Sequence, residues 1–212
     1  MYLPSAFAEA RPDQLAALIA QQPLATLIVQ HQGGLDADHV PLLLRPGAPH
    51  GTLAGHIAAA NPLVARIGDG IDCLAVFHGV QGYISPNGYA SKAQGGKVMP
   101  TWNYEVVHVH GRLRCVRDPA WLLALLHALT DTQEQSQASP WRVNDAPPDY
   151  IDRLLGAIVG IEIDIGSMQG KAKLSQNQPA ANQQSLLAAL HGAGDATSLQ
   201  MAAAIKERAK PG

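Results

Sequence analysis

The chain has 212 residues, of which 47% are hydrophobic and 15% are charged, and its formal net charge at pH 7 is −2. This composition is typical of a globular protein and excludes a disordered chain, while the near-neutral charge does not favour binding to nucleic-acid phosphates. No apolar run is long enough to predict a membrane span, and the first residues lack the pattern of a signal peptide. Cys73 and Cys115 lie in apolar runs, which indicates reduced core thiols and a cytoplasmic protein.

The first half of the sequence predicts one helix followed by short strands. Residues 11–23 form the predicted helix, because Pro12 suits its first turn and Pro23 its end. Strands are expected at residues 24–30, 39–45, 51–57, 72–79 and 82–85. Turn-forming residues fill 31–38 and a glycine-containing loop fills 86–96, whereas the alanine-rich stretch 58–62 predicts a short helix.

The second half predicts two more strands and several helices. A long strand runs to about Val116, and Asp118 is a suitable N-cap for the helix that follows. Residues 159–165 alternate, which predicts a strand with its isoleucines facing inward and with Glu162 and Asp164 facing outward. Further helical segments are expected at 150–158, 182–192 and 195–210.

These elements predict an α+β protein, a mostly antiparallel β-barrel with flanking helices and a helical C-terminal tail. The short connections of the first half suit hairpins, and the spacing of the elements argues against a doubly wound parallel sheet. We expect residues 1–181 to form one domain and residues 182–212 to be a helical appendage of it.

Two segments carry groups that bind anions. In "GHIAAANP", Gly55 and His56 precede a predicted helix whose free backbone N–H groups would favour a phosphate. In "YISPNGYASK", hydroxyls and the Lys92 ammonium lie on one loop and can grip an anionic ligand. Each segment also has a purely structural interpretation, as a tight turn with a surface histidine and as a solvated loop.

Two more segments lie at strand ends. In the strand that begins at Thr101, Asn103 and Glu105 share its face and suggest a pocket rim, and Trp102 and Tyr104 on the other face suggest either a protein interface or plain core. The fourth segment, "GKAKLSQNQ", is dense in hydrogen-bonding side chains and precedes the helical tail. Four such segments in one chain favour a ligand site more strongly than any one of them.

In this order, "GHIAAANP", "GYISPNGYASK", "VMPTWNYEVVHVHG" and "GKAKLSQNQ" resemble the PaiB family of FMN-binding negative transcriptional regulators. "MYLPSAF" and "HVPLLL" also resemble it, and the resemblance extends to about residue 190. It implies a split β-barrel similar to the pyridoxamine-phosphate oxidase fold, in which two subunits form two FMN sites at their interface.

The resemblance also implies which residues bind the cofactor. Gly55 and His56 would lie near the phosphate of FMN, and Thr101 and Asn103 would contact the flavin. Further contacts are implied for Ser85, Ser91, Lys92, Trp102, Lys173, Ser175 and Gln176. One departure is Gly88, which stands where the family often has an aromatic residue, so stacking on the flavin is expected to differ here.

Several functions remain open at the level of sequence. The leading hypothesis is a flavin-dependent regulator or sensor, and the alternatives are a flavin-dependent oxidoreductase and a haem-binding or haem-degrading protein. Direct DNA binding has weak support, because the tail offers only Lys206, Arg208 and Lys210. His108 and His110 share a strand face but lack an obvious third metal ligand, so no metal site is predicted, and no catalytic residue is assigned.

Overall fold

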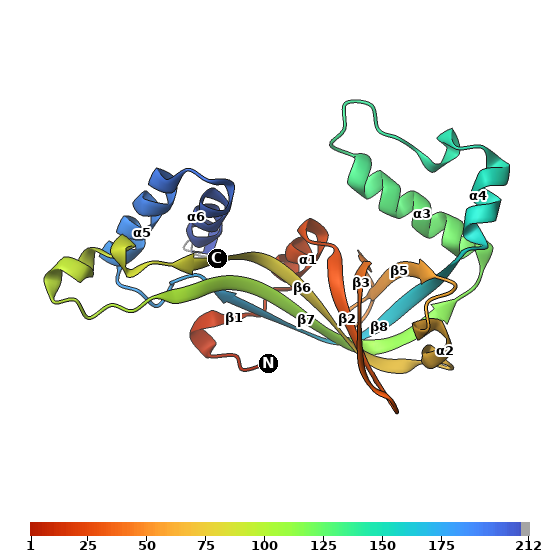
Figure 1. Ribbon diagram of the computed structural model, residues 1–212, viewed down its shortest axis with the longest axis horizontal. Helices are drawn as coiled ribbons and strands as arrows, with labels where there is room; N and C mark the ends of the chain where they lie inside the picture. The colour runs from red at the N-terminus through yellow and green to blue at the C-terminus, as the bar shows by residue number, and fades with distance from the viewer. Residues whose placement is uncertain (209–212) are drawn as a thin grey trace. The chain divides into compact units, whose positions relative to one another are not determined.

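The computed structural model describes residues 1–208, and the strands of this part form one eight-stranded sheet. The strands are β1 (Ala8–Glu9), β2 (Leu24–His31), β3 (Gly34–Pro41), β4 (Leu43–Arg45), β5 (Thr52–Ala58), β6 (Ile71–Ile84), β7 (Thr101–Val116) and β8 (Ile158–Lys173). Their order in the sheet is β3-β2-β6-β7-β8-β5-β4, with β1 beside β8 (Figure 1). The helices are α1 (Pro12–Gln21), α2 (Leu63–Ile67), α3 (Pro119–Glu134), α4 (Pro148–Leu155), α5 (Ala180–Ala193) and α6 (Ala196–Arg208).

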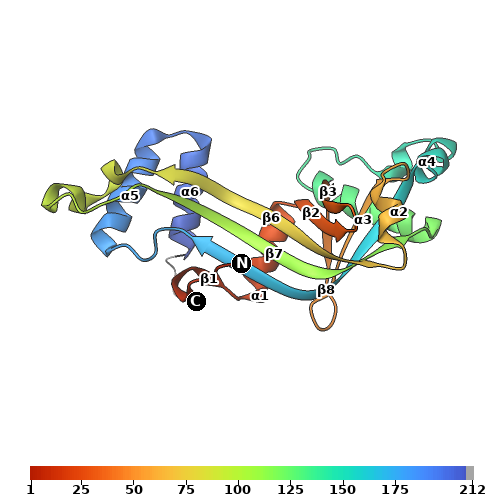
Figure 2. The ribbon, with the colours of Figure 1, turned by 60° about the horizontal axis from the view of Figure 1, so that its bottom comes forward.

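The chain divides into two compact units, each built from several segments. The first unit consists of Met1–Leu18, His78–His108 and the chain from Gln169 onward, and the second consists of Ile19–Phe77 and Val109–Met168. Strands β6, β7 and β8 contribute residues to both units, and they run beside one another (Figure 2).

The second unit has an apolar core made by strands that alternate inward and outward. β2 pairs antiparallel with β3 through a two-residue turn and with β6 on its other side, and β5 pairs antiparallel with β4 and β8. Its fully buried side chains include Leu27, Leu53, Phe77, Leu113 and Ile163. Helix α3 begins with the side chain of Asp118 accepting a hydrogen bond from the N–H of Ala120, as expected for an N-cap.

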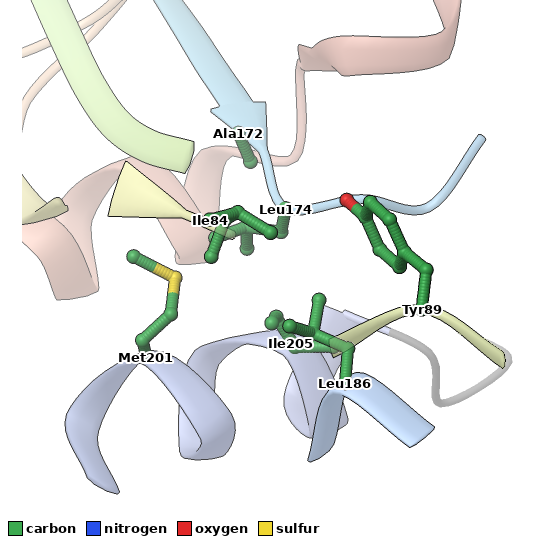
Figure 3. Close-up of a cluster of buried hydrophobic side chains, with 7 residues drawn as sticks. All are labelled: Ile84, Tyr89, Ala172, Leu174, Leu186, Met201 and Ile205. Carbon is green, nitrogen blue, oxygen red and sulfur yellow. The ribbon is translucent and has the colours of Figure 1, made fainter. Parts of the chain in front are cut away.

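The first unit has a small core of its own. Ile84 of β6, Ala172 of β8 and Leu174 face helices α5 and α6, which supply Leu186, Met201 and Ile205 (Figure 3). Tyr89, from the loop after β6, completes this cluster. Gly194 follows the last residue of α5 and has a left-handed conformation (φ 70°) that ends the helix. Glycine adopts this conformation without strain because it has no Cβ.

Two of the predicted elements are wrong, and the first of them bears on the candidate site. The helix expected at 58–62 does not form: β5 continues to Ala58, a turn follows, and α2 begins only after Pro62. Two contacts oppose the expected helix: Ala58 pairs with Ile158 of β8, and the side-chain oxygen of Asn61 accepts the N–H of Leu63, which favours a later helix start. The turn expected at 31–38 is limited to Gln32 and Gly33, because the residues that follow pair with β2.

Other elements differ in extent. The strands expected at 72–79 and 82–85 are one continuous strand, β6, and β8 runs on to Lys173. The loop 86–96 contains two short 3-10 helices, η2 (Pro86–Gly88) and η3 (Ala90–Gln94). Glu162 does lie on the face opposite the isoleucines of β8, but it is buried, because Arg114 and Arg45 cover its carboxylate.

Candidate functional site

The end of β8 is shaped by a residue in an unusual backbone conformation. Ser175 has φ 61° and is buried, a combination that costs a non-glycine residue about 1 kcal/mol. Gln176 stabilises the bend, because its side-chain oxygen accepts the N–H of Leu174 at 2.7 Å and its amide donates to the carbonyl of Ala172. The bend is therefore held by a side chain that replaces the missing strand partner.

Five polar side chains meet where β7 begins and β8 ends. The buried amide of Asn103 donates to the Ser175 hydroxyl at 2.9 Å, and that hydroxyl lies 3.5 Å from the Tyr89 hydroxyl. Beside them the Lys173 ammonium donates to the Thr101 hydroxyl. We call Tyr89, Thr101, Asn103, Lys173 and Ser175 the strand-end cluster. It combines one cation with an amide and three hydroxyls, which suits an anionic or carbonyl-rich ligand.

The loop between β6 and β7 brings a second cation to the same unit. The Ser85 hydroxyl caps η2 by accepting the N–H of Asn87, and the Lys92 ammonium donates to the side chain of Asn87 at 2.5 Å. The N–H of Ser91 donates to the side-chain oxygen of buried Asn182 in α5 at 3.0 Å. The loop is thus attached to the C-terminal helices and not a free surface loop.

The opposite face of β7 begins with an exposed tryptophan and a half-buried tyrosine. Trp102 is 50% exposed and Tyr83 of β6 is 57% exposed, and their ring centroids lie 6.4 Å apart. The Lys171 ammonium lies 5.3 Å from the ring centroid of Tyr104 and 5.6 Å from that of Tyr2. Trp102 is therefore not a core residue, and this face carries the kind of side chains found in ligand and subunit contacts.

Gly55 and His56 belong to the second unit and lie inside β5. A Cβ on Gly55 would approach the Leu42 side chain and the Pro41 carbonyl to 2.7 Å, so glycine allows this close packing. The ring of His56 is partly buried, burial lowers its pKa, and among the described atoms its Nδ1 has no hydrogen-bond partner. Because Gly55 lies within a strand, it has no helix N-terminus to offer a phosphate. The phosphate role that the resemblance implies for Gly55 and His56 stays a prediction.

The structure groups the predicted site residues by unit. The structure brings together Thr101, Asn103, Lys173 and Ser175 in the first unit. The side-chain amide of Gln176 is instead hydrogen-bonded to the backbone. The sequence pointed to the Tyr89 hydroxyl only as one of the polar groups on its loop, and it did not point to Asn182. The sequence does contain a signal for Asn182, which lies three residues after Pro179 in the first turn of a helix. An amide side chain at such a position can bond to nearby backbone groups.

Within residues 1–208, no three His, Cys, Asp or Glu side chains gather closely enough to hold a metal ion. In the same range, no helix is both long and apolar enough to cross a membrane.

Comparison with known proteins relates these features to a family. A family model described as "Putative FMN-binding domain" matches residues 1–167. The chain is similar to the uncharacterized protein AN0679 of Emericella nidulans, with 29% identity over 98% of this chain and 97% of the relative. It is also similar to protease synthase and sporulation protein PAI 2 of Bacillus subtilis, with 26% identity over 99% of each chain.

A solved structure has a similar fold. The FAD and haem binding protein of Mycobacterium smegmatis matches with a TM-score of 0.58 and 17% identity, covering 78% of this chain and 73% of that one. The antiparallel sheet and its helices thus form the split-barrel fold that the sequence motifs predict. The motifs of this chain, the family model and the Bacillus subtilis relative agree that the chain belongs to the PaiB family of FMN-binding proteins, with FMN as its cofactor.

Proposed function

We propose that this FMN-binding protein is a flavin-dependent regulator or sensor that works as a homodimer. The strand-end cluster carries the proposal, because it places a cation and several uncharged hydrogen-bonding groups together in one part of the chain. We assign FMN contacts to the eleven residues that the family resemblance implies. They are Gly55, His56, Ser85, Ser91, Lys92, Thr101, Trp102, Asn103, Lys173, Ser175 and Gln176.

The chemistry of these side chains fits FMN. The isoalloxazine ring offers carbonyl oxygens and ring nitrogens, and the phosphate is a dianion, so both hydrogen-bond donors and cations are needed. Lys173 has three N–H donors and gives one to Thr101, so it retains donors for a ligand. Bound FMN supplies one- and two-electron redox chemistry. The chain's own part is to orient the ring and exclude water from the buried amide of Asn103.

The exposed aromatic pair supports assembly with a second copy. Trp102 and Tyr83 expose half or more of their surface next to the strand end that carries Thr101. Large aromatic side chains of this kind are enriched in interfaces. We expect a dimer at micromolar concentration by light scattering, and Trp102→Arg should yield monomers. A parental protein that is monomeric and still holds FMN would contradict a cofactor site shared between subunits.

The tail gives direct DNA binding little support. Arg208 donates to the Glu9 carboxylate and, at 2.8 Å, to the carbonyl of Ala8, so its charge is engaged within the protein. Lys206 is exposed, and Lys210 lies outside the described residues. We therefore propose regulation that does not rely on α6 reading DNA. A gel shift that weakens steeply with salt would overturn this part of the proposal.

The decisive experiment compares the FMN affinity of Thr101→Ala/Asn103→Ala with that of the parent. Loss of two hydrogen-bonding groups should weaken binding by at least about tenfold without unfolding the protein. Asn144→Ala, at an exposed position of the second unit, is the matched control. Unchanged affinity in a folded double variant would remove these residues from the site.

The visible spectrum of the purified protein separates the remaining functions. Two flavin bands that persist after excess FMN is removed would support the proposal. A sharp Soret band would instead favour a haem protein, a reading prompted by the FAD and haem binding protein of similar fold. Steady NADH oxidation by the FMN-loaded protein would move the assignment from sensor to oxidoreductase. The free thiols of Cys73 and Cys115 agree with the cytoplasmic location that we propose.

A further inference from the structure

Helix α5 holds the loop that carries Ser91 and Lys92. The side-chain oxygen of Asn182 accepts the N–H of Ser91 at 3.0 Å, and the Ser185 hydroxyl accepts the N–H of Ala90 at 2.9 Å. Both acceptors are side chains of α5, while both donors are successive backbone groups at the start of η3. Two adjacent backbone groups of the loop therefore depend on one face of one helix.

Asn182 is itself held rigidly. It is buried, and its amide donates to the side-chain oxygen of Gln178 at 3.0 Å. The Ser185 hydroxyl also donates to the backbone carbonyl of Asn182 at 3.1 Å. A buried amide with both of its ends engaged has one orientation, so the oxygen offered to Ser91 is fixed in place.

The contact continues through apolar packing. A Cβ on Gly88 would lie 3.3 Å from the Leu186 side chain and 3.5 Å from the Cβ of Ala189, so this loop and α5 are in close contact. The Tyr89 ring lies in the same cluster as Leu186, with its hydroxyl directed away from α5 (Figure 3). That hydroxyl is the one near Ser175 of the strand-end cluster. Packing against α5 thus also sets the position of a cluster residue.

We propose that α5 positions the FMN site, with Asn182 and Ser185 as positioning residues that hold the Lys92 loop in its binding conformation. The inference rests on the proposed function, since it takes Ser91 and Lys92 as FMN contacts. After Tyr89, the segment 90–96 is rich in alanine, serine and glycine, so it would sample many conformations if α5 released it. Affinity falls in proportion to the fraction of molecules in the competent conformation.

The test compares three substitutions on α5 for FMN affinity, dissociation rate and flavin fluorescence. Asn182→Ala removes the acceptor and should weaken FMN binding by about tenfold, chiefly through faster dissociation. Ser185→Thr keeps the hydroxyl that accepts the N–H of Ala90 and should stay within about threefold of the parental affinity. Gln184→Ala, on the exposed side of the same helix, is the matched control and should change nothing.

Tryptic cleavage after Lys92 without FMN tests the loop directly, because the bond becomes accessible when the loop is released. Asn182→Ala should speed this cleavage several-fold, and Gln184→Ala should not. If Asn182→Ala does not fold, Ser185→Ala can replace it, because this variant leaves the Asn182–Ser91 bond intact. It should weaken FMN binding and speed cleavage after Lys92 by about threefold each. Parental cleavage and parental FMN affinity in a folded Asn182→Ala or Ser185→Ala variant would overturn the inference.

A double-mutant cycle separates this inference from the proposed function. Lys92→Ala alone tests the proposed contact, since unchanged FMN affinity in that variant would remove Lys92 from the site. If α5 acts through the loop, Asn182→Ala should have a smaller effect on affinity once Lys92 is alanine, and the remaining effect should come from Ser91. An Asn182 effect that persists undiminished in the Lys92→Ala background would show general destabilisation and would also overturn the positioning role.

Discussion

The two units bury polar side chains in different ways. In the first unit, Asn103, Ser175 and Asn182 are buried, and their partners are uncharged amides, hydroxyls and backbone groups. In the second unit, the buried polar residue is Glu162, whose carboxylate accepts from Arg114 and lies 3.9 Å from Arg45. The first set lies at strand ends and in a loop contact, while Glu162 lies within β8.

This difference supports the proposed ligand site in the first unit and a structural ion pair in the second. Arginines balance the charge of Glu162, and the guanidinium carbon of Arg45 also lies 4.9 Å from the ring centroid of Trp121. These side chains therefore satisfy one another within the protein. Neutral groups at strand ends leave lone pairs and N–H donors that are free to exchange partners with a ligand. The backbone strain at Ser175 points the same way, because strained residues concentrate at functional sites.

The largest expected effect comes from removing one buried leucine from each unit. Leu186→Ala and Leu27→Ala should each lower the free energy of unfolding by about 3 kcal/mol, measured by urea denaturation, because each leaves a cavity. Only Leu186 packs against the loop that carries Lys92, so only Leu186→Ala should also weaken FMN binding, by about tenfold. Equal loss of FMN affinity in both variants would mean that lost stability, and not the contact between Leu186 and the loop, weakens binding.

The ion pair of the second unit gives the next effect. Glu162→Gln keeps the shape of the side chain but leaves Arg45 without this counter-charge and Arg114 with only the Asp164 carboxylate, at 3.6 Å. We expect a loss of about 1–2 kcal/mol in stability, toward the low end because Arg114 is half exposed and water can solvate it. FMN affinity, measured by fluorescence titration, should stay at the parental value. A large drop in affinity would make Glu162 part of the ligand site.

Periodicity predicted the elements that are long and regular. The isoleucines of β8 and the N-cap of α3 are where the sequence pattern puts them, since alternation and local capping are encoded by neighbouring residues. The helix expected at 58–62 failed because alanine content is a weak preference, which pairing of β5 with β8 overrides. Glu162 was expected to be exposed, because its arginine partners lie far away in the sequence.

Motifs named four members of the strand-end cluster as site residues, but they did not predict the hydrogen bonds between them. Thr101, Asn103, Lys173 and Ser175 were expected in the site because "PTWNY" and "KLSQN" resemble family segments. That Asn103 pairs with Ser175 depends on strands β7 and β8 ending together, which residue spacing alone does not determine. The role of Asn182 depends on how α5 packs, which is a property of tertiary structure.

A smaller effect tests the backbone strain at Ser175. Ser175→Ala and Ser175→Gly both remove the hydroxyl that bonds Asn103, but only glycine adopts φ 61° without strain. The glycine variant should therefore be more stable than the alanine variant by about 1 kcal/mol, as measured by thermal unfolding. Both variants should bind FMN more weakly than the parent. Equal stability of the two variants would mean that the bend carries no strain.

The smallest effect concerns Glu105 and Glu9, two carboxylates of the first unit near Arg208. Burial raises the pKa of Glu105 above 4.5, an effect that the charge of Arg208 opposes and that of Glu9 reinforces. Burial alone would raise the pKa of Glu9, but hydrogen bonds from Arg11 and the charge of Arg208 lower it. The two groups should therefore respond to pH with opposite signs.

A raised pKa means that the folded protein holds the proton of Glu105 more tightly than the unfolded chain does, so stability falls as pH rises from 4.5 toward the folded pKa. Glu105→Gln should raise Tm at pH 7, by a few degrees or less, and should lose this advantage at pH 4. Glu9→Gln should do the reverse, lowering Tm at pH 7, since a lowered pKa stabilises the fold only while the group is ionised. A Glu105→Gln variant less stable than the parent at pH 7 would show that attraction to Arg208 outweighs burial at this site.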